Sequence, residues 1–262
     1  MGCSSFFLVP NMQHNWDLLC VLRDYGGVMR RFLAIGLFLF LAGCATYQSV
    51  PFEQSTAQPI KKIGLLSPSI PNEPTALLAT TVGQSFGLLG AIIDASMASA
   101  RANSLNSVLT SNKFYIRQEV EGRLVAALEE QGYEVVLVEA ARSSKRDFVS
   151  TYPSTEPVDA YLDVVMPAYG YASAGIGSSS PWRPFAMMKT RLVRASDKTV
   201  LMREDVAYNR LTDRNDDTVT ISADPSFQYA DFSGLESNSE RSAEGVRVAV
   251  TEASNTVGKL LR

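Results

Sequence analysis

The residues of this chain that most clearly indicate a covalent modification are Leu41-Ala42-Gly43-Cys44, in which a thiol directly follows small residues. An apolar run at 32–40 precedes the tetrapeptide, and Met29-Arg30-Arg31 precede that run. A basic start, an apolar run too short to span a bilayer and small residues at the cut site are typical of a secretory signal peptide. We therefore expect the chain to be cleaved next to Cys44.

The same four residues resemble the lipobox of bacterial lipoproteins. This resemblance implies that residues 29–43 are a signal peptide that is removed, and that a covalent lipid is attached to the sulfur of Cys44. Ala45 follows the cysteine, in place of the aspartate that favours retention at the inner membrane in that family. The resemblance therefore implies a lipid anchor in the outer membrane, with the rest of the protein facing the periplasm.

Residues 1–28 do not fit a signal peptide, because Asp17 and Asp24 would give it a long and partly acidic start. We interpret this stretch as an upstream extension outside the translated protein, which would begin at Met29. A real N-terminal extension is the alternative. The only histidine, His14, and two of the three cysteines lie in this stretch. The mature chain of 219 residues from Cys44 onwards then has no histidine and one cysteine.

The lack of histidine removes several classes of active site. Ser-His-Asp catalysis, Cys-His catalysis and histidine-bearing zinc sites are excluded, and no glycine motif for phosphate binding occurs. Cleavage of glycosides by two carboxylates stays open, but the sequence nominates no pair. We predict that the protein is not an enzyme and has no cofactor beyond the lipid on Cys44. A carboxylate-dependent cell-wall hydrolase is an alternative.

The charge of the chain excludes one class of partner. The mature chain has 21 Lys and Arg against 25 Asp and Glu, a net charge of −4 before the termini, and no basic run. Nucleic-acid-binding proteins usually carry a basic patch or stripe. We therefore expect no nucleic acid as a partner.

An aromatic segment at 169–182 is the candidate partner-binding loop. It combines Tyr169, Tyr171 and Trp182 with several glycines and serines. Aromatic side chains supply a large contact area at low entropic cost, which suits protein recognition. The alternative is a strand that runs into a hairpin loop with no binding role.

Acidic residues at 213–224 have the spacing of some ligands in a calcium loop. Asp213, Asn215, Asp217 and Asp224 fall at positions one, three, five and twelve. Position six is Thr218 where a calcium loop needs glycine. We therefore predict a solvated acidic loop and no metal site. We expect the nearby aromatics, at 227, 229 and 232, to anchor this loop to the domain.

The remaining pattern predicts an α/β sandwich of helices on one mixed sheet of about five strands. Residues 44–59 are polar and rich in proline, and are expected to form a flexible tether. The predicted elements of the domain at 60–262 are strands at 60–66, 133–139, 159–171, 185–194 and 199–208, a helix at 113–131 and a C-terminal helix. Strand 133–139 is expected to be buried, and Ser237 and Glu240 to form a capping box for the last helix.

Residues 75–110 predict a Gly/Ala-rich helical insert. Small residues recur every four positions, at Gly83, Gly87, Ala91, Ala95 and Ser99. On a helix this spacing makes a smooth ridge that another helix can approach closely. We favour a helix that packs on its own domain. A helix that inserts into a membrane or joins subunits of a homo-oligomer is the alternative.

The order of elements resembles that of several bacterial envelope lipoproteins. The lipobox, the strand at 60–66, the helix-Gly132-strand unit and the hairpin at 189–201 are similar to the curli-secretion-channel lipoprotein and to the activators of penicillin-binding proteins, whose core is like the N-terminal domain of the periplasmic Tol protein. The resemblance implies a non-enzymatic adaptor that binds other envelope proteins during envelope assembly or secretion. A homo-oligomeric pore or secretion-channel component is the alternative.

Overall fold

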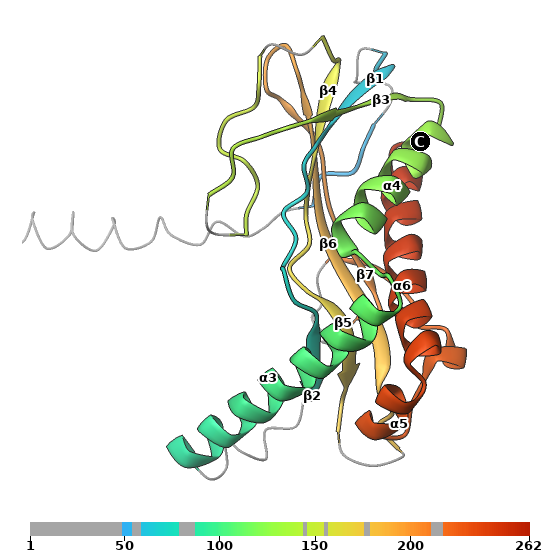
Figure 1. Cartoon of the computed structure of the whole chain (residues 1–262). Coiled ribbons are helices and arrows are strands. Elements are labelled where there is room, and N and C mark those ends of the chain that lie inside the picture. Colours follow the sequence, from blue (N-terminus) through green and yellow to red (C-terminus); the bar gives the residue numbers. More distant parts are fainter. Residues whose placement is uncertain are drawn as a thin grey trace, which may run out of the picture. The chain divides into compact units, whose positions relative to one another are not determined.

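The computed structural model in Figure 1 describes residues 49–53, 59–78, 87–143, 146–154, 157–175, 179–210 and 217–262, with only the backbone described at 87–95. All of these residues belong to one unit that spans Gln48–Arg262. Several predictions lie outside the described residues: the extension at 1–28, the signal peptide, the lipobox with Cys44, Gly83, Asp213 and Asn215.

One mixed sheet of eight strands forms the centre of the fold. Its strands are β1 (Lys62–Leu66), β2 (Thr75–Leu78), β3 (Glu134–Val138), β4 (Ala160–Val165), β5 (Tyr169–Ser173), β6 (Arg183–Arg194), β7 (Val200–Tyr208) and β8 (Val219–Ile221). The long strand β6 pairs with β7 along one side, and with β4 and then β5 along the other, all antiparallel. Strands β1, β2 and β8 add in parallel to β4, β5 and β7, and β3 adds in parallel to β1.

A mixed sheet with packed helices is confirmed, but the prediction of about five strands is wrong. The predicted strand at 159–171 is two strands, β4 and β5, with Pro167 in the gap between them. Proline has no N–H to give to a sheet ladder, so a break is expected there. The other unpredicted strands, β2 and β8, have four and three residues, and their pairing with β5 and β7 decides their conformation.

Two helices, α4 (Ile116–Glu129) and α6 (Ser239–Lys259), cover one face of the sheet and pack on each other (Figure 1). The helix predicted at 113–131 and the predicted C-terminal helix are both present. The residues of these two helices in the main core are Val120, Leu124, Leu128, Ala243, Val246, Ala249, Val250, Ala253 and Val257. Gly132 follows α4 with a φ of 89°, a left-handed conformation that favours glycine and is common just after a helix ends.

The predicted helical insert at 75–110 is corrected at its start, because Thr75–Leu78 is strand β2. Helix α3 spans Gly87–Ser111. The ridge positions 87, 91 and 95 lie on the described backbone of α3, and Ser99 is exposed.

The predicted capping box is wrong. Ser237 is the last residue of a short helix, α5 (Phe232–Ser237), and its hydroxyl donates to the Ser233 carbonyl at 2.8 Å. Asp231 caps α5 by accepting the Gly234 N–H at 2.7 Å. Helix α6 follows at once, and its N-cap residue, Asn238, makes no capping bond through its side chain.

Part of the predicted flexible tether is docked on the sheet. Val50 exchanges backbone hydrogen bonds with Arg203 of β7, with N···O distances of 2.9 and 2.8 Å. The Ser49 hydroxyl donates to the carboxylate of Glu204 at 2.8 Å. The segment expected to form a tether at 44–59 is therefore docked on β7 at Ser49 and Val50.

Close approach of α6 to α4 depends on a glycine. A Cβ at Gly258 would lie 2.7 Å from the Ala127 carbonyl oxygen of α4, which is closer than real Cβ contacts allow. Gly122 lies on the same helix pair, and a Cβ there would meet nothing within 4 Å.

We predict that Gly258→Ala lowers the free energy of unfolding by about 1–3 kcal/mol, because the helices must separate to admit the methyl group. The matched control, Gly122→Ala, should raise it by about 0.5–1 kcal/mol, because alanine is the better helix former. Urea denaturation of both variants measures the two effects. Equal midpoints would contradict the close packing of α6 on α4.

Candidate functional site

A buried carboxylate lies on the sheet face opposite α4 and α6. Side chains alternate along β4, so Leu162 and Val164 join the main core while Asp163 points to the other face. Asp163 is 0% exposed. An ion buried in this way requires charged or hydrogen-bonding partners, because removal from water is costly.

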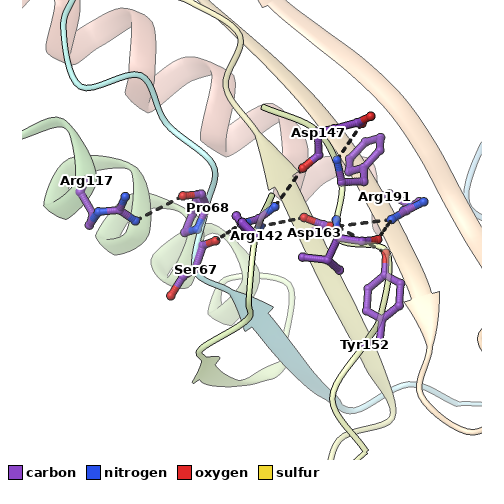
Figure 2. Close-up of polar contacts among 10 residues, drawn as sticks. Ser67, Pro68, Arg117, Arg142, Asp147, Tyr152, Asp163 and Arg191 are labelled. Atoms are coloured by element: carbon purple, nitrogen blue, oxygen red, sulfur yellow. Dashed lines mark hydrogen bonds and ion pairs between the residues drawn. The ribbon is translucent and has the colours of Figure 1, made fainter. Parts of the chain in front are cut away.

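The donors to Asp163 come from two separate segments of the chain (Figure 2). Arg142 Nη2 lies 2.8 Å from one carboxylate oxygen. The other oxygen accepts the Val149 N–H at 2.8 Å and faces Arg191 Nη2 and the Tyr152 hydroxyl, each at 3.5 Å. Two guanidinium groups and one carboxylate give this cluster a net charge of +1.

Arg191 is held by aromatic rings as well as by charge. Its guanidinium carbon lies 4.4 Å from the ring centre of Phe148 and 5.4 Å from that of Tyr152. Burial of the Tyr152 hydroxyl, together with the nearby charge of Asp163, raises the pKa of Tyr152 to about 12. The phenol is therefore neutral near pH 7 and acts in the cluster as a hydrogen-bonding group.

The cluster fastens the β3–β4 connection to the sheet. Arg142 Nε donates to the Ser67 carbonyl at 2.7 Å, directly after β1, and Arg191 Nη2 donates to the Val149 carbonyl at 2.8 Å. Figure 1 shows this connection on the side of the sheet away from α4 and α6. A second apolar cluster, made of Leu66, Val138, Val149 and Tyr161, lies beneath it. The connection therefore folds over the face of the sheet.

The β3 edge, defined here as residues Glu134–Glu139, is one end of the sheet, since β3 pairs with β1 alone among the described strands. The Glu134 N–H donates to the Lys61 carbonyl at 2.8 Å, and the Val138 carbonyl accepts the Ser67 N–H at 3.0 Å. Backbone groups alternate in direction along a parallel strand. The N–H and C=O groups of Val135 and Leu137 therefore point away from β1.

The β3 edge corrects the prediction of a buried strand at 133–139. The Leu137 side chain is 60% exposed, the largest exposed fraction among the large apolar side chains described. The sequence Glu-Val-Val-Leu-Val-Glu is typical of a buried strand, and its apolar content alone does not distinguish an edge from a centre. Two flanking glutamates were the available sign of an edge.

A second uncovered surface lies on α3. Leu105, Val108 and Leu109 near its C-terminal end are buried, whereas Met97 is 47% exposed. Figure 1 shows that the N-terminal half of α3 extends past β2 and away from the other helices. The segment 87–100 has a single charged residue, Asp94.

The aromatic residues assigned to a partner-binding loop lie inside the protein. Tyr169 and Tyr171 belong to β5, and with Trp182 they are at most 5% exposed. Trp182 packs edge-on against Phe232, with ring centres 5.1 Å apart, and Tyr171 packs against Tyr229 at 5.8 Å. This burial argues against a role as an exposed binding loop, and Tyr229 and Phe232 pack against these rings.

The described part of the acidic segment has a structural role. Asp224 begins a short 3₁₀ helix at Pro225–Phe227 and accepts the Ser226 N–H at 2.8 Å. Asp217 is exposed. Among the described residues, no three His, Cys, Asp or Glu side chains are grouped to hold a metal ion.

No helix within the described ranges is both long and apolar enough to cross a membrane.

Comparison with known proteins gives only weak likenesses. No family model and no curated protein matches the chain. Among solved structures, a DUF330-family protein from Xanthomonas campestris is similar, with a TM-score of 0.38 and 13% sequence identity. The matched region covers 82% of this chain and 92% of the Xanthomonas chain.

Two structures of the PelC dodecamer from Paraburkholderia phytofirmans are also similar. The first has a TM-score of 0.34 and 10% sequence identity, and the match covers 83% of this chain and 99% of the PelC chain. The second has a TM-score of 0.32 and 9% identity, and the match covers 79% of this chain and 93% of the PelC chain. Likeness at this level transfers no function to this chain. The resemblance to curli-channel and penicillin-binding-protein-activator lipoproteins stays a prediction.

We predict that Asp163→Asn lowers the free energy of unfolding by about 3–5 kcal/mol, because the charges of Arg142 and Arg191 lose their partner. The control is Asp147→Asn, an exposed residue in the same connection, which should change stability by at most about 0.5 kcal/mol. Thermal or urea unfolding monitored by circular dichroism measures both. If both variants unfold alike, the cluster does not hold the connection in place.

Proposed function

We propose that this protein is a lipid-anchored component of the bacterial outer membrane whose periplasmic domain is a non-enzymatic binding module. The signal peptide and lipobox at 29–44 support the anchor, with the lipid on Cys44. The observation that carries the binding role is the β3 edge, an apolar strand left open at one end of the sheet. Open strand edges bind extended segments of other polypeptides.

A role without catalysis agrees with the chemistry of the cluster around Asp163. Both oxygens of Asp163 already accept hydrogen bonds from fixed donors, and its neighbours are guanidinium groups and a phenol with a raised pKa. A general acid or base needs a pKa near the working pH and access to substrate. The cluster is better suited to hold the β3–β4 connection.

A homo-oligomer is the second candidate, and the N-terminal half of α3 favours it. An apolar helix that leaves its own domain is stable in water only when another surface covers it. The small residues Gly87, Ala91, Ala95 and Ser99 would allow a second copy to approach closely along that helix. This arrangement suits a ring or a secretion-channel component.

The anchor is tested by the mass of the protein released from membranes in mild detergent. We expect the native chain to begin at Cys44 and to carry the mass of its lipid. Cys44→Ser should lose the lipid and leave the membrane fraction. A chain that still carries residues 1–28 and no lipid would contradict the proposed anchor. A second protein in the released complex would support the binding role.

Gly87→Leu tests the homo-oligomer in the same native-mass experiment. If α3 joins subunits, the larger side chain should prevent close approach and convert the oligomer into monomers. Gly122→Leu is the matched control, because a Cβ there meets nothing within 4 Å and α4 should tolerate the change. An oligomer of unchanged size in Gly87→Leu would contradict the proposal that α3 joins subunits.

A further inference from the structure

We propose that the β3 edge receives an extended, positively charged segment of another protein as an added strand. This inference rests on the proposed binding function and names the partner by its chemistry. It depends on the backbone, apolar surface and charge of the β3 edge, and on how firmly that edge is held.

The backbone of β3 offers a complete set of hydrogen-bonding groups to a new strand. Residues 134, 136 and 138 are directed toward β1 by the observed register. Val135 and Leu137 therefore present two N–H donors and two C=O acceptors outward, at the two-residue spacing of a strand. An extended peptide can pair with both residues without any rearrangement of the sheet.

The exposed side chain of Leu137 adds apolar area beside these groups. Its partner in the register is Leu65 of β1, which is fully buried. A peptide strand placed against β3 would put one of its own side chains next to Leu137 on the same face. An apolar residue there would remove both side chains from water, which favours binding.

The charge around the edge selects the kind of segment. Residues 116–139, which comprise α4 and β3, contain six glutamates and two arginines, with no aspartate or lysine. Glu134 and Glu139 flank the strand and are exposed, and Lys62 lies 2.6 Å from the carboxylate of Glu134. The net charge of this region remains negative with Lys62 and with Arg247, which lies 3.2 Å from Glu119, included. A segment with Lys or Arg at its ends is therefore complementary.

The same charges disfavour a second copy of this chain. In an antiparallel pair of two β3 edges, Val135 of one copy would bond to Leu137 of the other. This register places Glu134 of one copy opposite Val138 of the other and Glu139 opposite Tyr133, so glutamates of both copies gather at each end of the pair. Such gathering of like charges is unfavourable, so a basic segment of a different protein fits better.

The edge is also held ready for binding. Arg142, three residues beyond Glu139, is fixed to both Ser67 and Asp163. The chain that leaves β3 is therefore drawn over the sheet face and does not fold back along the open side. A preordered edge loses little entropy when a peptide binds, which raises affinity.

The test uses the full lipidated chain in detergent and a fluorescent peptide of alternating valine and threonine with two lysines at each end. Leu137→Lys should weaken binding at least about tenfold, because the new charge repels the peptide and removes apolar contact. Leu77→Lys is the matched control, since Leu77 is an exposed leucine on another edge strand, β2. The same peptide with glutamates at its ends should bind at least about tenfold more weakly to the native chain.

Hydrogen exchange gives a readout at single residues. Peptide binding should slow amide exchange at Val135 and Leu137, while Val136, whose N–H already faces β1, changes little. Equal binding by Leu137→Lys and the native chain, or no slowing at these two amides, would overturn the proposal. If amide exchange at Val135 and Leu137 is slowed without peptide, and more so at higher protein concentration, the β3 edges of two copies pair with each other and the proposal is overturned.

The native complex separates this inference from the proposed function. If a second protein is released with the native chain and also with Leu137→Lys, the binding role holds and the strand inference fails. If the lipidated chain is released alone, the binding role itself fails, whatever the peptide does.

Discussion

Burial of the Asp163 carboxylate is the constraint on which the sheet face opposite α4 and α6 depends. A charge removed from water must be met by donors in fixed positions, and here they come from the β3–β4 connection and from β6. The connection must therefore cross the face of the sheet to reach Asp163. Its path determines how the chain leaves β3 and keeps the outer side of that strand open.

The two faces of the sheet are stabilised by different means. Helices α4 and α6 bury the main apolar core on one face. On the other face, a small apolar cluster and the charges around Asp163 hold a long connection in place. A sheet covered in this way leaves backbone groups open at its edges, and β3 is one of those edges. Helix α3 contributes a separate surface, since it extends beyond the sheet that supports its C-terminal end.

Periodic patterns predicted the elements that depend on burial of one face. The apolar stripes of α4 and α6 and the β6–β7 hairpin follow from spacing alone, because each element packs through residues that recur at its own period. Residue patterns that do not recur at the period of a helix or strand were interpreted less well. Tyr169, Tyr171 and Trp182 were assigned to a candidate partner-binding loop because they lie near glycines and serines, with a strand as the alternative, and they are buried in β5 and against Phe232.

The sequence by itself determined the pattern typical of a signal peptide and lipobox, the absence of histidine after His14, and the helix-Gly132-strand unit. These depend on local composition and spacing. Tertiary structure alone decided that Asp163 is buried between two arginines, that Val50 docks on β7, and that β3 is an edge. Each of these depends on pairing between residues far apart in the chain. Strand order sets that pairing, and a strand's own residues do not encode its neighbours.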